Sequence, residues 1–147
     1  METVIEAVEK SIRIRAPARK IFDYISDPNH LSVIWANVVR VHDVQMLSHG
    51  RHRYRWQYKL CEVRFEGESE CVALSVPDRM TEKWRGGIQG QVDWVLISHN
   101  GDTLVTLRLE YAFPTPLTQK HTCEDVNASQ ARDIESALEN LKRVMEG

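Results

Sequence analysis

Hydrophobic and polar residues alternate with two different spacings along this chain, and each spacing predicts one kind of element. Residues 4–15 alternate loosely, so that Ile12 and Ile14 share one face while Arg13 and Arg15 share the other. An alternation of this kind predicts a half-buried strand at the start of the fold.

Two short helices are predicted after this strand. Pro17 stands near the start of the first helix, where a missing backbone N–H has no consequence. Asp27 ends that helix, because a residue that precedes proline avoids the α region. Residues 29–34 predict the second helix. The first helix carries an apolar stripe at helical spacing, formed by Ile21, Phe22 and Ile25.

Beyond the second helix the apolar positions alternate with a period of two, which predicts a series of strands. Val39 and Val41 indicate a strand that reaches about Leu47, and residues 48–50 indicate a turn. The clearest alternation covers residues 51–60, where a largely aromatic face opposes a basic one. The inward positions of this strand are His52, Tyr54, Trp56, Tyr58 and Leu60.

Residues 61–72 alternate as well, with an acidic face opposite an apolar one. If they pair with residues 51–60, the basic and acidic faces meet, and opposite charges across the strands contribute roughly 0.2–1 kcal/mol each. We therefore interpret these charges as structural rather than as a ligand site. The positions predicted to point inward are Cys61, Val63, Phe65, Ser69 and Cys71.

Three more strands and one long helix complete the prediction. Asn100-Gly101 supplies the positive φ angles that a tight hairpin needs. The last strand is predicted from Thr103 to Phe113, and the helix from about Glu124 to Glu146. The inward strand positions are Met80, Glu82 and Trp84, then Val92, Trp94 and Leu96, then Val105, Leu107, Leu109 and Tyr111. The apolar stripe of the helix is Ala131, Ile134, Leu138, Leu141 and Met145.

Several motifs resemble those of a known family. Ala16-Pro17 precedes the run Ile21-Phe-Asp-Tyr24, which is followed by Asp27-Pro28 and then by Trp35. Residues 101–111, Gly-Asp-Thr-Leu-Val-Thr-Leu-Arg-Leu-Glu-Tyr, resemble the last strand of that family. Together with the order of the elements, these motifs are similar to the START/Bet v 1-like (SRPBCC) superfamily. That superfamily includes the polyketide cyclase/dehydrase-like proteins.

The resemblance implies an α+β helix-grip fold. In that fold a curved antiparallel sheet wraps around a long C-terminal helix, and two short helices follow the first strand. It also implies a ligand cavity between the sheet and the long helix. We expect residues 1–147 to form a single ligand-binding domain, because the length suits one domain and no linker or repeat is visible.

Composition and charge narrow the range of partners. A formal net charge of -2 gives no overall basic field for nucleic acid, and no apolar run approaches the ~20 residues of a membrane-spanning helix. The acidic N-terminus does not resemble a secretory signal. We therefore expect a cytoplasmic protein without stable membrane insertion, whose cysteines, Cys61, Cys71 and Cys123, are reduced thiols.

The sequence contains no pattern typical of a metal or cofactor site. His42, His49 and His52 are separated by a predicted hairpin turn, and no cysteine or carboxylate has matching ligand spacing. Asp23 and Asp27 lie four residues apart on the first helix, where a solvated face is the simpler interpretation. We predict no metal and no cofactor.

Aromatic side chains on the inward faces are the best candidates for a ligand site. For any single one, core packing is the simpler interpretation, since large aromatics fill the space between a sheet and a helix. Together, in a fold that encloses a cavity, they are predicted to line it, and their polar groups would orient the ligand. The predicted ligand-binding residues are Trp35, His52, Tyr54, Trp56, Tyr58, Phe65, Met80, Trp84, Trp94 and Tyr111.

Glu82 leaves two alternatives open. Its phase with Met80 and Trp84 points it inward, where a carboxylate is costly unless it is paired or protonated. A bulge in the strand would instead turn it outward.

Three classes of function are compatible with this pattern. The first is a protein, monomeric or weakly dimeric, that binds a hydrophobic small molecule such as a lipid, isoprenoid or aromatic metabolite. The second is a polyketide cyclase or dehydratase-like enzyme that uses the same cavity for proton transfer. Inward ionisable groups within reach of one another would favour the enzyme, and an apolar pocket would favour the binding protein. The third, an interaction module, would need an exposed apolar patch that the sequence does not indicate.

Overall fold

A computed structural model of the chain describes residues 5–112 and 126–147. Within these residues one antiparallel sheet has the strand order β1-β7-β6-β5-β4-β3-β2. The strands are β1 (Ile5–Ile14), β2 (Val38–Met46), β3 (His52–Leu60), β4 (Val63–Ser75), β5 (Arg79–Gly86), β6 (Gly90–His99) and β7 (Asp102–Ala112). The helices are α1 (Ala18–Ile25), α2 (Leu31–Ile34) and α4 (Val126–Glu146), with 3-10 turns at Pro28–His30 and Ser48–Gly50.

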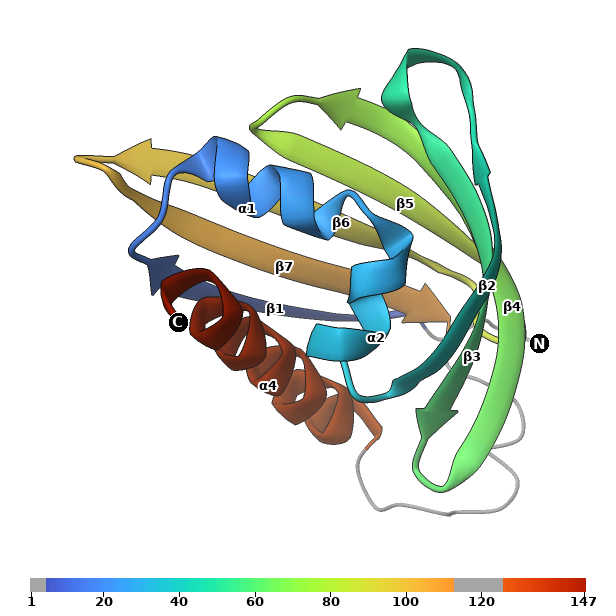
Figure 1. Ribbon diagram of the computed structural model, residues 1–147. Coiled ribbons are helices and arrows are strands. Elements are labelled where there is room, and N and C mark those ends of the chain that lie inside the picture. The colour runs from blue at the N-terminus through green and yellow to red at the C-terminus, as the bar shows by residue number, and fades with distance from the viewer. Residues whose placement is uncertain (1–4, 113–125) are drawn as a thin grey trace.

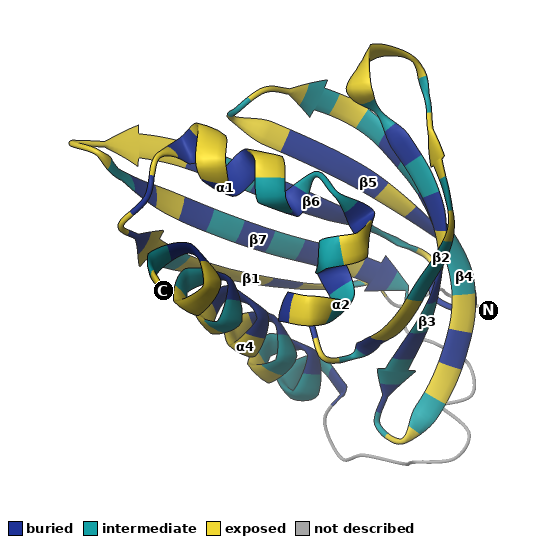
Figure 2. Ribbon diagram, viewed as in Figure 1, coloured by how far each residue is buried: buried dark blue, intermediate teal, exposed yellow. Residues whose placement is uncertain are grey.

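The sheet is strongly curved, and the three helices of the described residues lie on its concave side (Figure 1). Buried positions alternate with more exposed ones along most of the strands, as Figure 2 shows on β7. This arrangement confirms the helix-grip fold. It leaves the inner face of β3 to β7 turned towards the helices, where the core lies.

The long helix is fixed against the edge strand β1. The backbone N–H of Arg15 donates to Glu146 Oε2 at 2.9 Å, and Lys142 Nζ donates to the carbonyl oxygen of Arg13 at 3.0 Å. The predicted stripe is confirmed except at Ala131, which is only partly buried because Gln130 occupies the buried position of that turn. The buried face of α4 consists of Val126, Gln130, Ile134, Ala137, Leu138, Leu141 and Met145.

The alternation predicted for β3 is confirmed over its whole length. On the outer face Arg53 Nη2 donates to Glu70 Oε1 of β4 at 2.7 Å, and Gln57 Nε2 donates to Glu66 Oε1 at 3.2 Å. The basic and acidic faces therefore meet as expected. Because these groups are still partly exposed to solvent, each pair contributes only about 0–1 kcal/mol.

One predicted strand position is wrong, and one confirmed strand is irregular. The strand predicted from Val39 and Val41 is confirmed as β2, but its register with β3 shifts between Val38 and Arg40, so that Val38 is buried and Val39 is exposed. Cys61 does not belong to β4: Cys61 and Glu62 form the turn before it, with φ angles of 51° and 67°. The last strand ends at Ala112 as described, and position 113 lies outside the described residues.

The cysteines also differ from expectation. Cys61 is disulfide-bonded, so it is not the reduced thiol that we predicted. Cys71 is a free, buried thiol on β4, and Cys123 lies outside the described residues.

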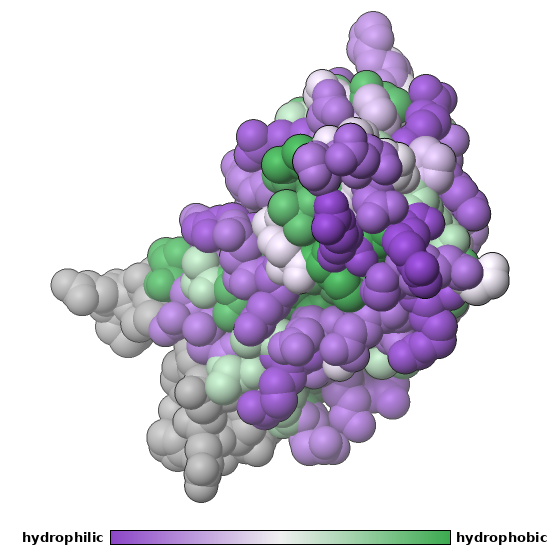
Figure 3. Space-filling model, turned by 90° about the vertical axis from the view of Figure 1, so that its left-hand side faces the viewer, coloured by the Kyte–Doolittle hydropathy of each residue, from purple (hydrophilic) through white to green (hydrophobic). Residues whose placement is uncertain are grey.

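The face of the molecule in Figure 3 is mainly hydrophilic. Figure 3 shows charged and polar side chains over most of one face, with apolar side chains visible between them near its centre. The large apolar side chains that are exposed belong to several elements, including Val33 of α2, Met46 of β2 and Ile97 of β6. Among the described helices, none combines the length and the apolar character needed to cross a membrane.

Candidate functional site

All ten residues predicted to bind a ligand are buried, and none is more than 5% exposed. Their elements place them on the helix-facing side: four come from β3, one from β4, two from β5, and one each from β6, β7 and the segment after α2. Burial alone suits a packed core as well as a ligand site. The contacts of the polar groups among them decide which interpretation is stronger.

Four aromatic rings form one cluster, which we call the aromatic cluster: Trp35, Trp56, Tyr58 and Trp84. The ring centroid of Trp84 lies 4.9 Å from that of Trp56, 5.4 Å from that of Tyr58 and 5.7 Å from that of Trp35. Trp35 follows the last residue of α2, and its backbone N–H donates to the carbonyl oxygen of Leu31. The cluster therefore joins β3, β5 and the α2 segment at tilted and edge-on angles that aromatic pairs favour.

The aromatic cluster is linked to the long helix by a buried glutamine. The Tyr58 hydroxyl donates to Gln130 Oε1 at 2.6 Å, and Gln130 is fully buried. Burial and the charge of Asp133 raise the pKa of Tyr58 well above its usual range, so the hydroxyl remains a donor. We did not predict Gln130. Its spacing from Val126 and Ile134 places it on the buried face of α4, and that spacing was the signal in the sequence that could have identified it.

Several polar atoms around the cluster are buried without a protein partner. Among the described residues, Trp56 Nε1, Trp84 Nε1 and Gln130 Nε2 have no hydrogen-bond acceptor. Native proteins leave few buried donors unpaired, because each costs about 1–3 kcal/mol. These three N–H groups therefore remain without an acceptor among the described residues.

A second group of polar side chains lies next to the cluster, and we call it the buried triad: His52, Tyr54 and Glu82. Glu82 points inward from β5, which settles the alternative left open by the sequence. Its Oε2 lies 2.5 Å from His52 Nε2, and its Oε1 accepts a hydrogen bond from the Tyr54 hydroxyl at 2.9 Å. Burial and the charge of Glu82 raise the pKa of Tyr54 well above its usual range.

The remaining predicted residues, which belong neither to the aromatic cluster nor to the buried triad, lie on the same inner face of the sheet. Phe65 lies directly opposite Tyr58 in the β3–β4 pair, and Met80 lies opposite Trp94 in the β5–β6 pair. The Tyr111 hydroxyl donates to Asn127 Oδ1 of α4 at 3.1 Å. Asn127, like Gln130, is a helix residue that the sequence prediction missed.

Cys71 lies opposite Glu82 across the β4–β5 pair and is shielded by the same core. Burial, together with the negative charge of Glu82, raises the pKa of its thiol to about 11. A thiol reacts as the thiolate, so we expect Cys71 to resist iodoacetamide in the folded protein at about pH 8 and to react after unfolding in urea. Peptide mass spectrometry locates the label, and rapid labelling of native Cys71 would contradict the expectation.

Asp133 on α4 provides a test of the electrostatics beside the cluster. Burial raises its pKa above 3.8, although Arg132 opposes the shift. A carboxylate with a raised pKa stabilises the fold only where it is protonated, and this contribution is lost as the pH rises through the folded-state pKa. We therefore expect Asp133→Asn to increase the free energy of unfolding at neutral pH. Urea melts across the pH range should show the gain shrinking as the pH falls towards 3.8 and disappearing below it; a constant gain would contradict this account.

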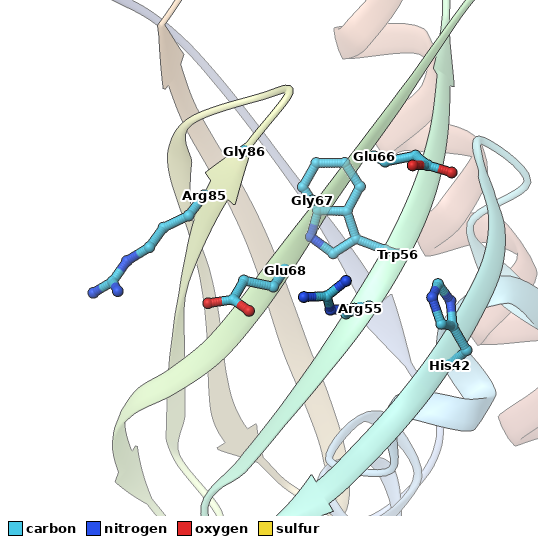
Figure 4. A pocket seen from close by; sticks show the side chains of 8 residues that line it. All are labelled: His42, Arg55, Trp56, Glu66, Gly67, Glu68, Arg85 and Gly86. Carbon is cyan, nitrogen blue, oxygen red and sulfur yellow. The ribbon is translucent and has the colours of Figure 1, made fainter.

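A recess of about 350 Å³ lies on the opposite, outer face of the sheet (Figure 4). A Cβ atom on Gly67 would lie 2.5 Å from the ring of Trp56, so the glycine makes room for this ring, which is part of the lining of the recess. The rim is charged, and of the ten predicted residues the recess contains only Trp56. Its lining consists of His42, Arg55, Trp56, Glu66, Gly67, Glu68, Arg85 and Gly86. This open, charged surface does not match the hydrophobic site predicted from the sequence.

A comparison with models of protein families identifies the family of this chain. Residues 6–146 match the family described as polyketide cyclase / dehydrase and lipid transport. The chain belongs to this family of the START/Bet v 1-like superfamily, as its motifs indicated. Among curated proteins, none matches the chain.

Solved structures share the fold at low sequence identity. A protein of Thermus thermophilus is 19% identical, with a TM-score of 0.82 over 96% of this chain and 97% of its own. An aromatase/cyclase from a Streptomyces species is 13% identical, with a TM-score of 0.79 over 97% of this chain and 94% of its own. A START superfamily protein of Mycobacterium smegmatis is 12% identical, with a TM-score of 0.75 over 95% of this chain and 97% of its own. At these identities the likeness establishes the fold and no shared substrate.

Proposed function

We propose that this protein binds a hydrophobic, aromatic small molecule against the inner face of the sheet, beside α4. One observation carries the proposal: three buried N–H donors, of Trp56, Trp84 and Gln130, lack acceptors within a cluster of aromatic rings. A planar ligand could stack against these rings while its oxygen atoms accept from the donors. The family description, which includes both cyclases and lipid transport, is compatible with such a ligand.

The alternative predicted from the sequence is an enzyme that acts in the same site. It requires inward ionisable groups within reach of one another, and His52 and Glu82 meet that requirement. A binding protein and an enzyme would both bind a ligand at this site, so the following experiment tests ligand binding.

A titration with two ligands of equal shape tests the proposal. Anthraquinone carries two carbonyl oxygens, whereas anthracene carries none. Both should quench tryptophan fluorescence, and anthraquinone should bind at least about 10-fold more tightly, because its oxygens satisfy buried donors. Trp84→Phe keeps an aromatic ring but removes one donor, so it should reduce the preference for anthraquinone.

Arg55→Gln is the matched control, since Arg55 lines the outer recess and not the inner face. It should leave both affinities unchanged. If neither ligand binds, or if Arg55→Gln abolishes binding while Trp84→Phe does not, the inner face is not the ligand site.

A further inference from the structure

We infer that the outer recess is a second binding site, which takes a phosphate group that still carries a proton. Its binding residues are Arg55, Glu68 and Arg85, which all line the recess. The two arginines bind the negative oxygen atoms, and Glu68 accepts the hydrogen bond of the remaining P–OH. The recess and the proposed aromatic ligand lie on opposite faces of the sheet, so this inference goes beyond the proposed function and does not depend on it.

The three binding residues form one row across the sheet. Arg55 of β3 lies directly opposite Glu68 of β4, and Glu68 lies directly opposite Arg85 of β5. Opposite charges in such positions are close enough to pair across the strands. In the part of the chain that the structure describes, however, none of these three side chains has an ion pair or a hydrogen bond.

The next row shows that the same residue types do pair elsewhere on this face. Arg53 and Glu70 are also directly opposite each other on β3 and β4. Arg53 Nε and Nη2 both donate to Glu70 Oε1, at 3.0 and 2.7 Å. The same chemistry in the same register thus gives a pair in one row and unpaired charges in the other. The unpaired row is the one that borders the recess, where a ligand has access to it.

The recess has room for a ligand between these side chains. Its volume of about 350 Å³ is in the range of small-molecule sites, and Gly67 and Gly86 contribute no side chains to it. Figure 4 shows the Glu68 carboxylate between the guanidinium groups of Arg55 and Arg85. An anion in the recess would therefore meet all three groups.

His42 provides an observation that is independent of the charged row. It lines the recess from β2, and its Nδ1 is buried without a hydrogen-bond partner among the described residues. Buried polar atoms of native proteins are rarely left unpaired. An imidazole nitrogen that carries its proton donates to an oxyanion, so a bound phosphate would supply the missing partner.

The charges of the row define the chemistry of the ligand. Two guanidinium groups and one carboxylate leave a surplus of one positive charge, which favours an anion. Glu66 adds little to the balance, because its carboxylate already accepts from Gln57 Nε2 at 3.2 Å. A carboxylate only accepts hydrogen bonds, so the anion also has to present a donor to Glu68. A protonated phosphate group meets both requirements, and guanidinium groups bind its oxygens through paired N–H donors.

Sulfate is the matched comparison for phosphate. The two ions have the same tetrahedral shape, but at neutral pH sulfate has lost both protons whereas phosphate retains a P–OH. Beside Glu68 a sulfate oxygen would face another acceptor with the same sign of charge. The recess should therefore distinguish two ions that a general attraction to positive charge treats alike.

Calorimetric titrations with inorganic phosphate and with sulfate test the inference. At pH 7 and constant low ionic strength, we expect phosphate to bind at least about 10-fold more tightly than sulfate. In a ¹⁵N–¹H spectrum, phosphate should shift the backbone amide signals of Gly67 and Gly86, because both residues line the recess. These shifts locate the bound ion.

Four variants separate the binding residues from general charge effects. Arg55→Gln and Arg85→Gln should each weaken phosphate binding at least about 10-fold, because each removes a charged donor. Glu68→Gln should instead raise the affinity for sulfate about 10-fold and abolish the preference for phosphate, since an amide also donates. Arg64→Gln is the control: it removes the same charge from the outer face of β4, outside the recess, and should change neither affinity.

An ester distinguishes the two sources of a phosphate group. Phenyl phosphate is titrated at pH 6, where about half of such an ester retains its proton, and is compared with inorganic phosphate at the same pH. Tighter binding of the ester would assign the site to a phosphorylated small molecule whose organic part fills the rest of the recess. Tighter binding of inorganic phosphate would assign it to the free ion. Both results support the site.

Three results would overturn the inference. The first is that phosphate does not bind, and the second is that sulfate binds as tightly to the parent protein. The third is that Arg64→Gln weakens binding as much as Arg85→Gln, which would mean general attraction to a charged surface. None of these results affects the aromatic ligand, whose binding is measured separately on the inner face.

Discussion

Replacing Leu138 by alanine is expected to lower the free energy of unfolding by about 2–5 kcal/mol. Leu138 is 1% exposed and lies on the face of α4 that packs on the sheet, so its truncation leaves a cavity and removes contacts. Urea melts of the variant and the parent measure the difference.

Asp23→Ala is the control for this prediction. Asp23 lies on the exposed side of α1, where it pairs with Arg19 four residues earlier. Its removal should change stability by a few tenths of a kcal/mol, as surface changes usually do. Equal effects of the two substitutions would mean that α4 does not cover the core as described.

Glu82→Ala should have a comparable or larger effect, about 3–5 kcal/mol, because it leaves His52 and Tyr54 buried without their shared partner. Glu82→Gln should be tolerated much better, since the amide retains a carbonyl for Tyr54 and fills the same volume. Thermal and urea melts of the two variants give this comparison. If alanine and glutamine are equally harmless, the triad contributes nothing to the fold and its geometry is in doubt.

The inner face of β3 could be predicted from the sequence because its two sides differ strongly. Aromatic residues alternate there with Arg51, Arg53 and Arg55, and only one register buries the first set. The same argument predicted Trp84, Trp94 and Tyr111 on their strands. These positions follow from local pattern alone.

Glu82 was harder to place because β5 does not alternate cleanly. Met80, Thr81 and Glu82 are all buried in succession, and the register with β4 shifts between Cys71 and Ala73. A bulge of this kind depends on the neighbouring strand and so has no signature in the β5 sequence.

Gln130 and the turn at Cys61 are two further features that the sequence did not predict. The partner of Gln130 is Tyr58, 72 residues away in the sequence, and no local pattern reveals such a pair. In this turn Cys61 and Glu62 have positive φ angles, a conformation for which glycine or asparagine is the usual sequence signal. Neither residue is present here, so the alternation of polar and apolar residues was read as a strand that continued through the turn.

The central claim is that a ligand occupies the inner face beside the aromatic cluster, and the tryptophan indoles test it most directly. The chain has four tryptophans, so a ¹⁵N–¹H spectrum resolves four indole N–H signals that single Trp→Phe substitutions assign. Trp84 belongs to the inner face alone, whereas Trp56 also reaches the outer recess. On addition of anthraquinone we predict a large shift of the Trp84 signal, because its unpaired N–H gains an acceptor. A ligand that binds without moving the Trp84 signal would contradict the account.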